Sequence, residues 1–319
     1  MKTKQSRVFS FACQVFVIVI VLSLISCGSL SKVQNKSVGS FATACDSFNR
    51  YPSLLLAQIA QIRMERGLFY AASLSDPQNK INELNSIFEA FEQDMKLASK
   101  CDFSLKILKS YSYALKVLTS DGRWKSRGVE FRSLGRAIDS LVIETNKLNI
   151  FEEQLPVGVA KSAAKIVAYG AETLLKRKQH RLTRAFVSEA DTLVQALVLG
   201  LVQTLRSPQL TALIENEKNG LPLNYKSFLM SLNSSTPPLS NTIDYDRKYL
   251  QLKEQCSKLT YSRGYIISAS NRLAKTHKEL AKSLYNKKEA GEVFEQLSHL
   301  IEDIEMLQKQ FKYIVEAEW

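Results

Sequence analysis

The feature that most constrains the fold is a heptad column of apolar residues in the C-terminal part of the chain. The column recurs mostly at steps of three, four or seven residues: Tyr245, Tyr249, Leu252, Cys256, Leu259, Ile266, Leu273, Leu280, Leu284, Phe294, Leu297, Ile301, Ile304, Phe311 and Ile314. A period of 3.5 residues is typical of helices that pack with left-handed, coiled-coil-like geometry. The register continues across residues 286–291, which favours one very long helix, although Gly291 and the charges around it allow a kink or a hairpin.

Shorter stripes of the same kind predict helices in the first half of the chain. A first helix is expected from about Thr43 to Leu74, and the turn Ser75-Asp76-Pro77 separates it from a second helix, with Asp76 as its N-cap. The second helix ends at the turn signal Asp121-Gly122. It is expected to bury one apolar face made of Ile81, Leu84, Phe88, Phe91, Met95 and Ala98, followed by Leu105, Leu108, Tyr111, Leu115 and Leu118.

Two further helices are predicted over residues 125–148 and 157–205. The second of them carries a wide apolar face around Leu193–Leu205, and it is expected to be the most buried helix of the body. A membrane-inserted helix is the alternative, but the apolar run is shorter than 18 residues and polar residues such as Asp191 and Gln195 interrupt or flank it. The chain has 12 Gly and 7 Pro residues in 319, and this scarcity disfavours an all-β body with many tight turns.

The N-terminal segment has the layout of a secretory signal. Basic residues precede an apolar run from Val15 to Ile25, and a small residue followed by Cys27 ends the segment. The tetrapeptide Leu24-Ile25-Ser26-Cys27 resembles the lipobox of bacterial lipoprotein precursors at all four positions. The resemblance implies that the Cys27 sulfur receives a diacylglycerol, that a peptidase cuts before Cys27, and that the new amino group is usually acylated. An uncleaved signal anchor and a cleaved soluble form are the alternatives.

The resemblance also implies a location. Two or three acyl chains would anchor the protein firmly to a membrane of the cell envelope, because each buried methylene contributes about 0.8 kcal/mol. Gly28 and Ser29 follow Cys27, and the absence of Asp there favours the outer membrane if the source is Gram-negative. The net charge is +12, and it falls to +9 when the three basic residues of the signal are removed. Outside the cytoplasm such a charge can meet anionic headgroups or acidic wall polymers, and nucleic acid is a poor expectation; an ordinary soluble domain can carry the same charge.

The sequence therefore predicts an all-α protein, an elongated antiparallel helical bundle with a long coiled-coil-like C-terminal helix. Its expected organisation is a signal peptide (1–26), a flexible tether (27–42), a helical bundle (43–233), a linker rich in Pro and Ser (234–242), and a long helix or helical hairpin that packs on the bundle (243–319).

Three cysteines remain after the signal is removed and Cys27 is lipidated. In an oxidising compartment one pair is expected to form, and Cys256 lies on the heptad column as a buried thiol. If the first two helices form a hairpin about Asp76, Cys45 lies 31 residues before the turn and Cys101 lies 25 after it. This mismatch corresponds to ~9 Å of helix, against the roughly 7 Å between Cα atoms that a disulfide tolerates. A break at Cys101 or an early end of the first helix would close the gap, so a Cys45–Cys101 bond is one prediction and three free thiols are the other.

A basic cluster stands near the start of the helix predicted over 157–205. Because it covers most sides of a helix, it must be solvated or face something anionic, such as lipid headgroups or an acidic partner. The cluster consists of Lys176, Arg177, Lys178, Arg181 and Arg184, with His180 among them.

No catalytic residue, metal or other cofactor is predicted. Glu292, Glu295, His299 and Glu302 share one helical face, but helical bundles that bind two metal ions need matching ligands on other helices. The chain contains no Gly-rich phosphate loop, no GxSxG and no HExxH motif.

Three functions remain after these exclusions. The first is a non-enzymatic envelope lipoprotein, a helical scaffold, adaptor or exclusion/immunity factor that binds another envelope protein. The second is a lipoprotein that binds a lipid, a small ligand or a wall polymer in an apolar cavity around Leu193–Leu205. The third is an enzyme whose site no motif marks.

Overall fold

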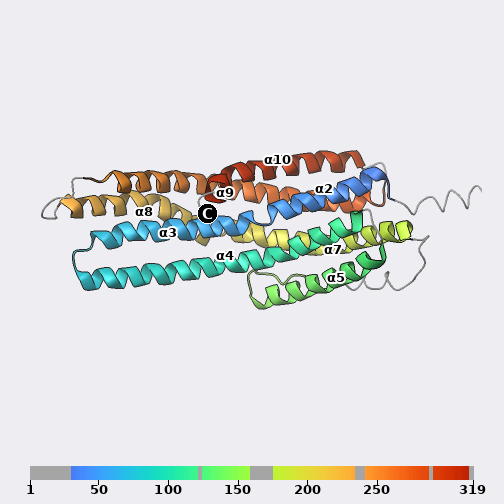
Figure 1. Cartoon of the computed structure of the whole chain (residues 1–319), viewed down its shortest axis with the longest axis horizontal. Coiled ribbons are helices and arrows are strands. Elements are labelled where there is room, and N and C mark those ends of the chain that lie inside the picture. Colours follow the sequence, from blue (N-terminus) through green and yellow to red (C-terminus); the bar gives the residue numbers. More distant parts are fainter. Residues whose placement is uncertain (1–29, 121–123, 159–174, 234–240, 287–289, 316–319) are drawn as a thin grey trace, which may run out of the picture.

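The computed structural model describes residues 30–120, 124–158, 175–233, 241–286 and 290–315, and within these ranges the regular structure is helical, without strands. The prediction of an all-α bundle is confirmed (Figure 1). The predicted signal, Cys27 and most of the predicted linker lie outside the described residues. The helices are α2 (Lys32–Phe48), α3 (Tyr51–Ser73), α4 (Pro77–Thr119), α5 (Trp124–Lys147), α7 (Leu175–Arg206), α8 (Pro208–Asn233), α9 (Ile243–Ser283) and α10 (Ala290–Val315).

Four helical segments run along the long axis of the molecule, and each is antiparallel to the segment before it in this order. α2 and α3 run in one direction as a single broken rod, α4 returns, α7 and α8 form a second broken rod, and α9 returns again (Figure 1). With 43 residues, α4 alone spans the molecule, a length of ~65 Å at ~1.5 Å per residue. We call the end where α2 and α7 begin the N-terminal end, and the end with the α3–α4 and α8–α9 connections the distal end.

Local signals explain where the rods break. Pro52 stands in the first turn of α3, where the missing N–H costs nothing, and α2 ends just before it at Asn49. Asp76 caps α4 by accepting a hydrogen bond from the Asn79 N–H at 2.7 Å, with Pro77 next to it. Ser207 separates α7 from α8, and its hydroxyl accepts a hydrogen bond from the Leu210 N–H at 3.2 Å.

The prediction of a flexible tether through residue 42 is wrong from Lys32 onward, because α2 begins there. Ser31 and Gln34 form a capping box, in which each side chain accepts a hydrogen bond from the other residue's backbone N–H. Val38 and Phe41 are fully buried. Together with Cys45 and Phe48, which are also fully buried, they recur at steps of three and four residues and form the face that α2 packs against the bundle.

The C-terminal heptad column forms a hairpin, not one continuous helix. α9 ends at Ser283, and α10 runs back beside it, with Arg272 Nε 2.6 Å from Asp303 Oδ2 across the pair. Near the end of α10, the ring of Phe311 lies 5.5 Å from the ring of Tyr51, so α10 ends beside the break between α2 and α3. α5 and α10 therefore pack only on the N-terminal half of the rod (Figure 1).

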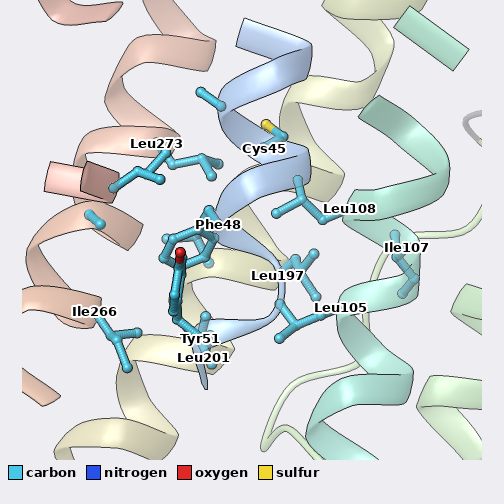
Figure 2. Packing of buried hydrophobic residues seen from close by; sticks show 14 of the residues in the cluster. Cys45, Phe48, Tyr51, Leu105, Ile107, Leu108, Leu197, Leu201, Ile266 and Leu273 are labelled. Atoms are coloured by element: carbon cyan, nitrogen blue, oxygen red, sulfur yellow. The ribbon is translucent and has the colours of Figure 1, made fainter. Parts of the chain in front are cut away.

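The core in this half is continuous across five helices. Figure 2 shows Phe48, Tyr51, Leu105, Leu108, Leu197, Leu201, Ile266 and Leu273 packed together. Leu193, Leu197 and Leu201 of α7 are each almost fully buried. Residues Gln179–Arg206 are long and apolar enough to cross a membrane, but so are many core helices, and 56% of the apolar window is buried inside the bundle. Within the described residues the face around Leu193–Leu205 is thus packed core, which does not favour the alternative of an apolar cavity there.

Candidate functional site

The N-terminal end of the rod brings together the residues that follow Cys27 and the predicted basic cluster. The N–H of Leu30, three residues after Cys27, donates a hydrogen bond to His180 Nδ1 at 3.0 Å. Gln34 Nε2 donates to the Ser283 carbonyl, and Gln179 Nε2 donates to the Leu118 carbonyl, each at 2.5 Å. These bonds join the start of α2 to the end of α9, and the start of α7 to the end of α4.

The predicted basic cluster lies at the start of α7, beside this junction. Lys176, Arg177 and Lys178 occupy the first turn of the helix, where only the backbone is described. Arg181 is exposed and Arg184 is half-buried. The structure thus brings the predicted cluster to the same end of the molecule as the chain that leads to Cys27, a proximity that no local pattern in the sequence indicates.

The prediction of a Cys45–Cys101 disulfide is wrong, because both residues are free and buried, as is Cys256. Asp46 forms an ion pair with Lys116 at 2.6 Å, so Cys45 lies near residue 116 of α4. Cys101 is 15 residues earlier on α4, or ~22 Å along the helix. Burial raises the pKa of the Cys101 thiol to about 12 and that of Cys256 to about 11, and it raises the pKa of Cys45 as well.

The distal half of α4 carries an exposed apolar face that the sequence analysis assigned to the core. Phe88 is 60% exposed and Ile81 is 51% exposed, whereas Leu108, farther along the same helix, is 1% exposed. We define the distal apolar face as Ile81, Leu84 and Phe88 of α4 with Leu68 of α3. Leu68 lies at the same level because Gly67 faces Ile87 across the α3–α4 hairpin.

The reach of α5 explains why this face is uncovered. The Tyr113 hydroxyl donates a hydrogen bond to Glu130 of α5 at 2.6 Å. Because the two helices are antiparallel, Lys147 at the end of α5 lies about level with Lys96 of α4, each 17 residues from that bond. α5 thus stops before it reaches the distal half of α4, as Figure 1 shows.

A polar network crosses the core in the N-terminal half. His277 of α9 is fully buried, and its Nδ1 lies 2.8 Å from Asp191 of α7 while its Nε2 lies 2.7 Å from the Tyr111 hydroxyl of α4. Because the carboxylate can only accept, Nδ1 donates to Asp191, and Nε2 of the neutral ring accepts from Tyr111. The hydrogen bond from His277 lowers the pKa of Asp191, and burial raises the pKa of Tyr111. The network joins three helices of the core.

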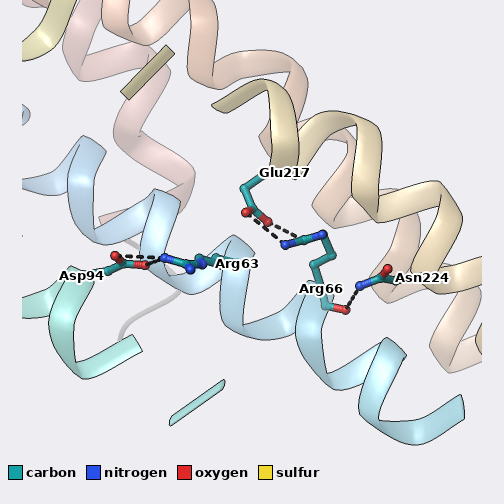
Figure 3. A network of polar contacts seen from close by, with 5 residues as sticks. All are labelled: Arg63, Arg66, Asp94, Glu217 and Asn224. Carbon is teal, nitrogen blue, oxygen red and sulfur yellow. Dashed lines mark hydrogen bonds and ion pairs between the residues drawn. The ribbon is translucent and has the colours of Figure 1, made fainter. Parts of the chain in front are cut away.

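A second network lies between α3, α4 and α8 (Figure 3). Arg66 forms two hydrogen bonds with Glu217, whose side chain is 1% exposed, and Arg63 pairs with Asp94. Gly220 leaves room for the guanidinium, because a Cβ there would lie 2.2 Å from Arg66 Nη1 and would displace it. Burial raises the pKa of Glu217, and the charge of Arg66 opposes that shift.

Two neighbouring hollows lie between α10 and the rod made of α2 and α3, and together we call them the groove between α2 and α10. Their volumes are about 540 and 530 Å³, and both are lined by Glu305 and Gln308. Small residues of α2, including Gly39 and Ser40, line one wall, and Ile304 lies in the other. Four basic residues stand along the groove, Lys36, Arg50, Lys309 and Lys312.

The carboxylates near His299 do not form a metal site. His299 lies 3.3 Å from Glu302 and 3.9 Å from Glu295, and all three side chains are exposed on α10. Among the residues with described positions, no group of three or more His, Cys, Asp or Glu side chains is arranged to hold a metal ion.

Because the comparisons with known proteins find no match, a function has to be proposed from the fold and the surfaces described above. No protein-family model, no curated protein and no solved structure matches the chain. The class that the structure defines is an elongated antiparallel α-helical bundle.

Proposed function

We propose that this protein is a lipid-anchored envelope lipoprotein that acts as a non-enzymatic scaffold or adaptor for another envelope protein. The observation that carries the proposal is the distal apolar face, a stripe of large exposed apolar side chains on the half of α4 that α5 does not reach. Exposed apolar patches on soluble proteins commonly mark sites of protein interaction.

The shape of the face indicates what covers it. Ile81, Leu84 and Phe88 recur at steps of three and four, so the exposed stripe is one helix wide. On the C-terminal half of the same helix, the corresponding partner is a helix, α5. We therefore assign the distal apolar face to an amphipathic helix of a partner protein, which would dock as a helix in a shallow groove.

The position of the face supports an adaptor role. The lipobox-like tetrapeptide would anchor Cys27 next to the N-terminal end, and the described chain begins three residues later at Leu30. The distal apolar face lies near the other end of α4, so the rod would separate a membrane from a partner by roughly the length of that helix, ~65 Å. An elongated bundle with a solid core is suited to this task.

Crosslinking in the native envelope tests the partner. A photoreactive residue at Phe88 should capture one defined envelope protein, and Leu84→Glu should abolish that capture while the helical circular dichroism stays unchanged. Lys253, exposed on α9, provides the matched control position. Equal capture at Phe88 and Lys253, or capture that survives Leu84→Glu, would remove the basis for the adaptor proposal.

Lipid labelling tests the anchor separately. Cys27→Ala should block incorporation of labelled fatty acid and processing of the precursor, whereas Cys256→Ala should leave both unchanged. A Cys27→Ala variant that is still labelled would show that the lipobox resemblance is misleading.

A second candidate function is the binding of a single-chain amphiphile with an anionic head in the groove between α2 and α10. The volume of each hollow falls within the usual range of ligand sites. Ile301, which is 39% exposed, offers apolar surface, and Arg50 and Lys309 offer positive charge. Titration with palmitate by calorimetry tests it: saturable binding that Lys309→Glu weakens would support the groove, and the absence of heat with the wild type would exclude this ligand.

A further inference from the structure

We infer that the N-terminal end of the rod is a cationic platform that rests on anionic lipid headgroups and holds the rod upright on the membrane. The inference rests on the proposed anchoring at Cys27, and it adds the orientation that an anchor alone cannot provide. A lipid at Cys27 would attach the chain to a membrane at a single point, and one point of attachment does not fix the direction of the rod.

The first observation is that several helix ends meet beside the chain that follows Cys27. The Leu30–His180, Gln34–Ser283 and Gln179–Leu118 hydrogen bonds bind the ends of four helices to one another. α5 also begins at this end, and α10 begins there after the connection from α9 (Figure 1). The end is therefore a rigid, multi-helix surface whose distance from the anchor is only a few residues.

The second observation is the charge of this surface. Basic residues come from the first turns of α2, from the start of α7 and from the last turns of α9. Acidic residues with described side chains in the same region include Glu279, which pairs with Lys282 at 2.9 Å, Glu292 in the first turn of α10, and Asp191, whose charge interacts with that of Lys278. The basic residues with described side chains are Lys32, Lys36, Arg181, Lys278 and Lys282, all exposed, and Lys176, Arg177 and Lys178 lie in the first turn of α7.

The third observation is a pair of exposed apolar side chains among these charges. Val33 is 53% exposed on the first turn of α2, and Tyr285 is 66% exposed just after α9. Tyrosine is favoured at the level of lipid headgroups, because its ring can enter the apolar boundary while its hydroxyl remains hydrated. Cations around a Tyr and an aliphatic residue are the combination that binds an anionic membrane surface.

Contact between this end surface and lipid headgroups would orient the rod. Lys32 and Arg181 lie on different helices of the end surface, so their simultaneous contact with headgroups fixes the direction of the rod. Each Lys or Arg near an anionic surface shifts such an equilibrium roughly fivefold. Several of them acting together should keep nearly all molecules upright, with the distal apolar face away from the membrane.

Energy transfer on reconstituted vesicles tests the orientation. The full chain, purified from membranes, carries Gln78→Cys at the exposed start of α4 and a donor dye on that thiol, while the described native cysteines are buried. The protein is placed in phosphatidylcholine vesicles with or without 30 mole per cent phosphatidylglycerol, roughly one acidic headgroup in three, and a headgroup-linked acceptor dye.

We expect weak transfer on the acidic vesicles, because the donor stands ~65 Å from the surface, and severalfold stronger transfer on neutral vesicles. The variant Lys32→Glu/Lys36→Glu/Arg181→Glu should give strong transfer on both. The control Lys80→Glu/Lys96→Glu/Lys253→Glu makes the same change in charge at exposed positions away from the platform, and it should behave like the wild type.

Flotation of the same samples separates the two proposals. A chain that floats with both vesicle types and transfers energy equally on them keeps the anchor and overturns the platform, leaving the basic end to an acidic protein partner. A chain that floats only with acidic vesicles supports the platform and overturns the anchor. A chain that floats with neither overturns both.

Discussion

The buried ion pair between Arg66 and Glu217 offers the sharpest test of how the distal half of the bundle is held together. The Glu217 side chain is 1% exposed and that of Arg66 is 24% exposed, with Nε 2.6 Å from Oε2. In Arg66→Met the carboxylate would remain buried without its counter-charge. Loss of one partner of a buried pair typically costs about 3 to 5 kcal/mol, and a chain of this size loses roughly 6 to 20 °C in Tm for that amount.

The pH dependence of this cost follows from the direction of the Glu217 pKa. Burial raises that pKa above its ordinary value of 4.5, so the favourable contribution of Glu217 is complete below pH 4.5 and is lost as the pH rises through the folded-state pKa. Removal of Arg66, whose charge lowers the pKa, raises it further. The destabilisation by Arg66→Met should therefore be largest near pH 8 and should shrink toward pH 5.

Urea denaturation followed by circular dichroism at pH 5 and pH 8 measures both effects. The double variant Arg66→Met/Glu217→Leu should regain most of the lost stability, because it removes the uncompensated charge. Arg247→Met, at an ion pair in which both side chains are largely exposed, should cost less than about 1 kcal/mol. A cost below about 1 kcal/mol for Arg66→Met at pH 8, a cost independent of pH, or a double variant no better than the single one would refute the reasoning.

Three further predictions concern the core of the N-terminal half. Tyr111→Phe removes the partner of His277 Nε2 and should lower the unfolding free energy, measured in urea, by about 1 to 3 kcal/mol. Tyr113→Phe, at an exposed position, should leave the urea midpoint unchanged. Equal effects of the two changes would contradict the proposed network. Leu273→Ala, at a fully buried site, should cost about 2 to 5 kcal/mol, and a smaller loss would mean that the core collapses around the gap. The described cysteines should resist Ellman's reagent in the native protein, because they are buried and burial raises the pKa of thiols such as Cys101 to about 12. All of them should react in denaturant without reductant. A missing thiol would indicate a disulfide.

The predictability of the helices depended on the strength of their local signals. The turn at Asp76-Pro77 was predicted from residue types that favour a helix start, and α4 begins at Pro77. α2 was missed as far as residue 42 because this stretch is rich in Ser, Lys and Asn, although Val38 and Phe41 continue the spacing of the buried residues Cys45 and Phe48. The hairpin between α9 and α10 could not be distinguished from one helix by its period, since both halves present the same apolar column to the same core.

The candidate surfaces were less predictable than the helices. The basic cluster was visible in the sequence, but its position beside Leu30 depends on a hydrogen bond between residues 150 apart. The distal apolar face was mistaken for core, because Phe88 and Leu108 belong to one continuous stripe with no local difference between covered and uncovered parts. The prediction of a Cys45–Cys101 bond needed a break at Cys101 or an early end of the first helix, whereas α4 continues through Cys101 and Asp46 meets Lys116.

The sequence by itself determined that this chain is helical and which side of most helices is apolar, because the spacing of side chains along a helix is a local property of the backbone. Only the tertiary structure decided which apolar stretches are covered, which helix ends meet, and which cysteines lie within reach of one another. These outcomes depend on helix lengths and on the register between helices distant in sequence. A stripe such as Ile81–Phe88 is core when a neighbouring helix is long enough to reach it, and surface when that helix ends at Lys147.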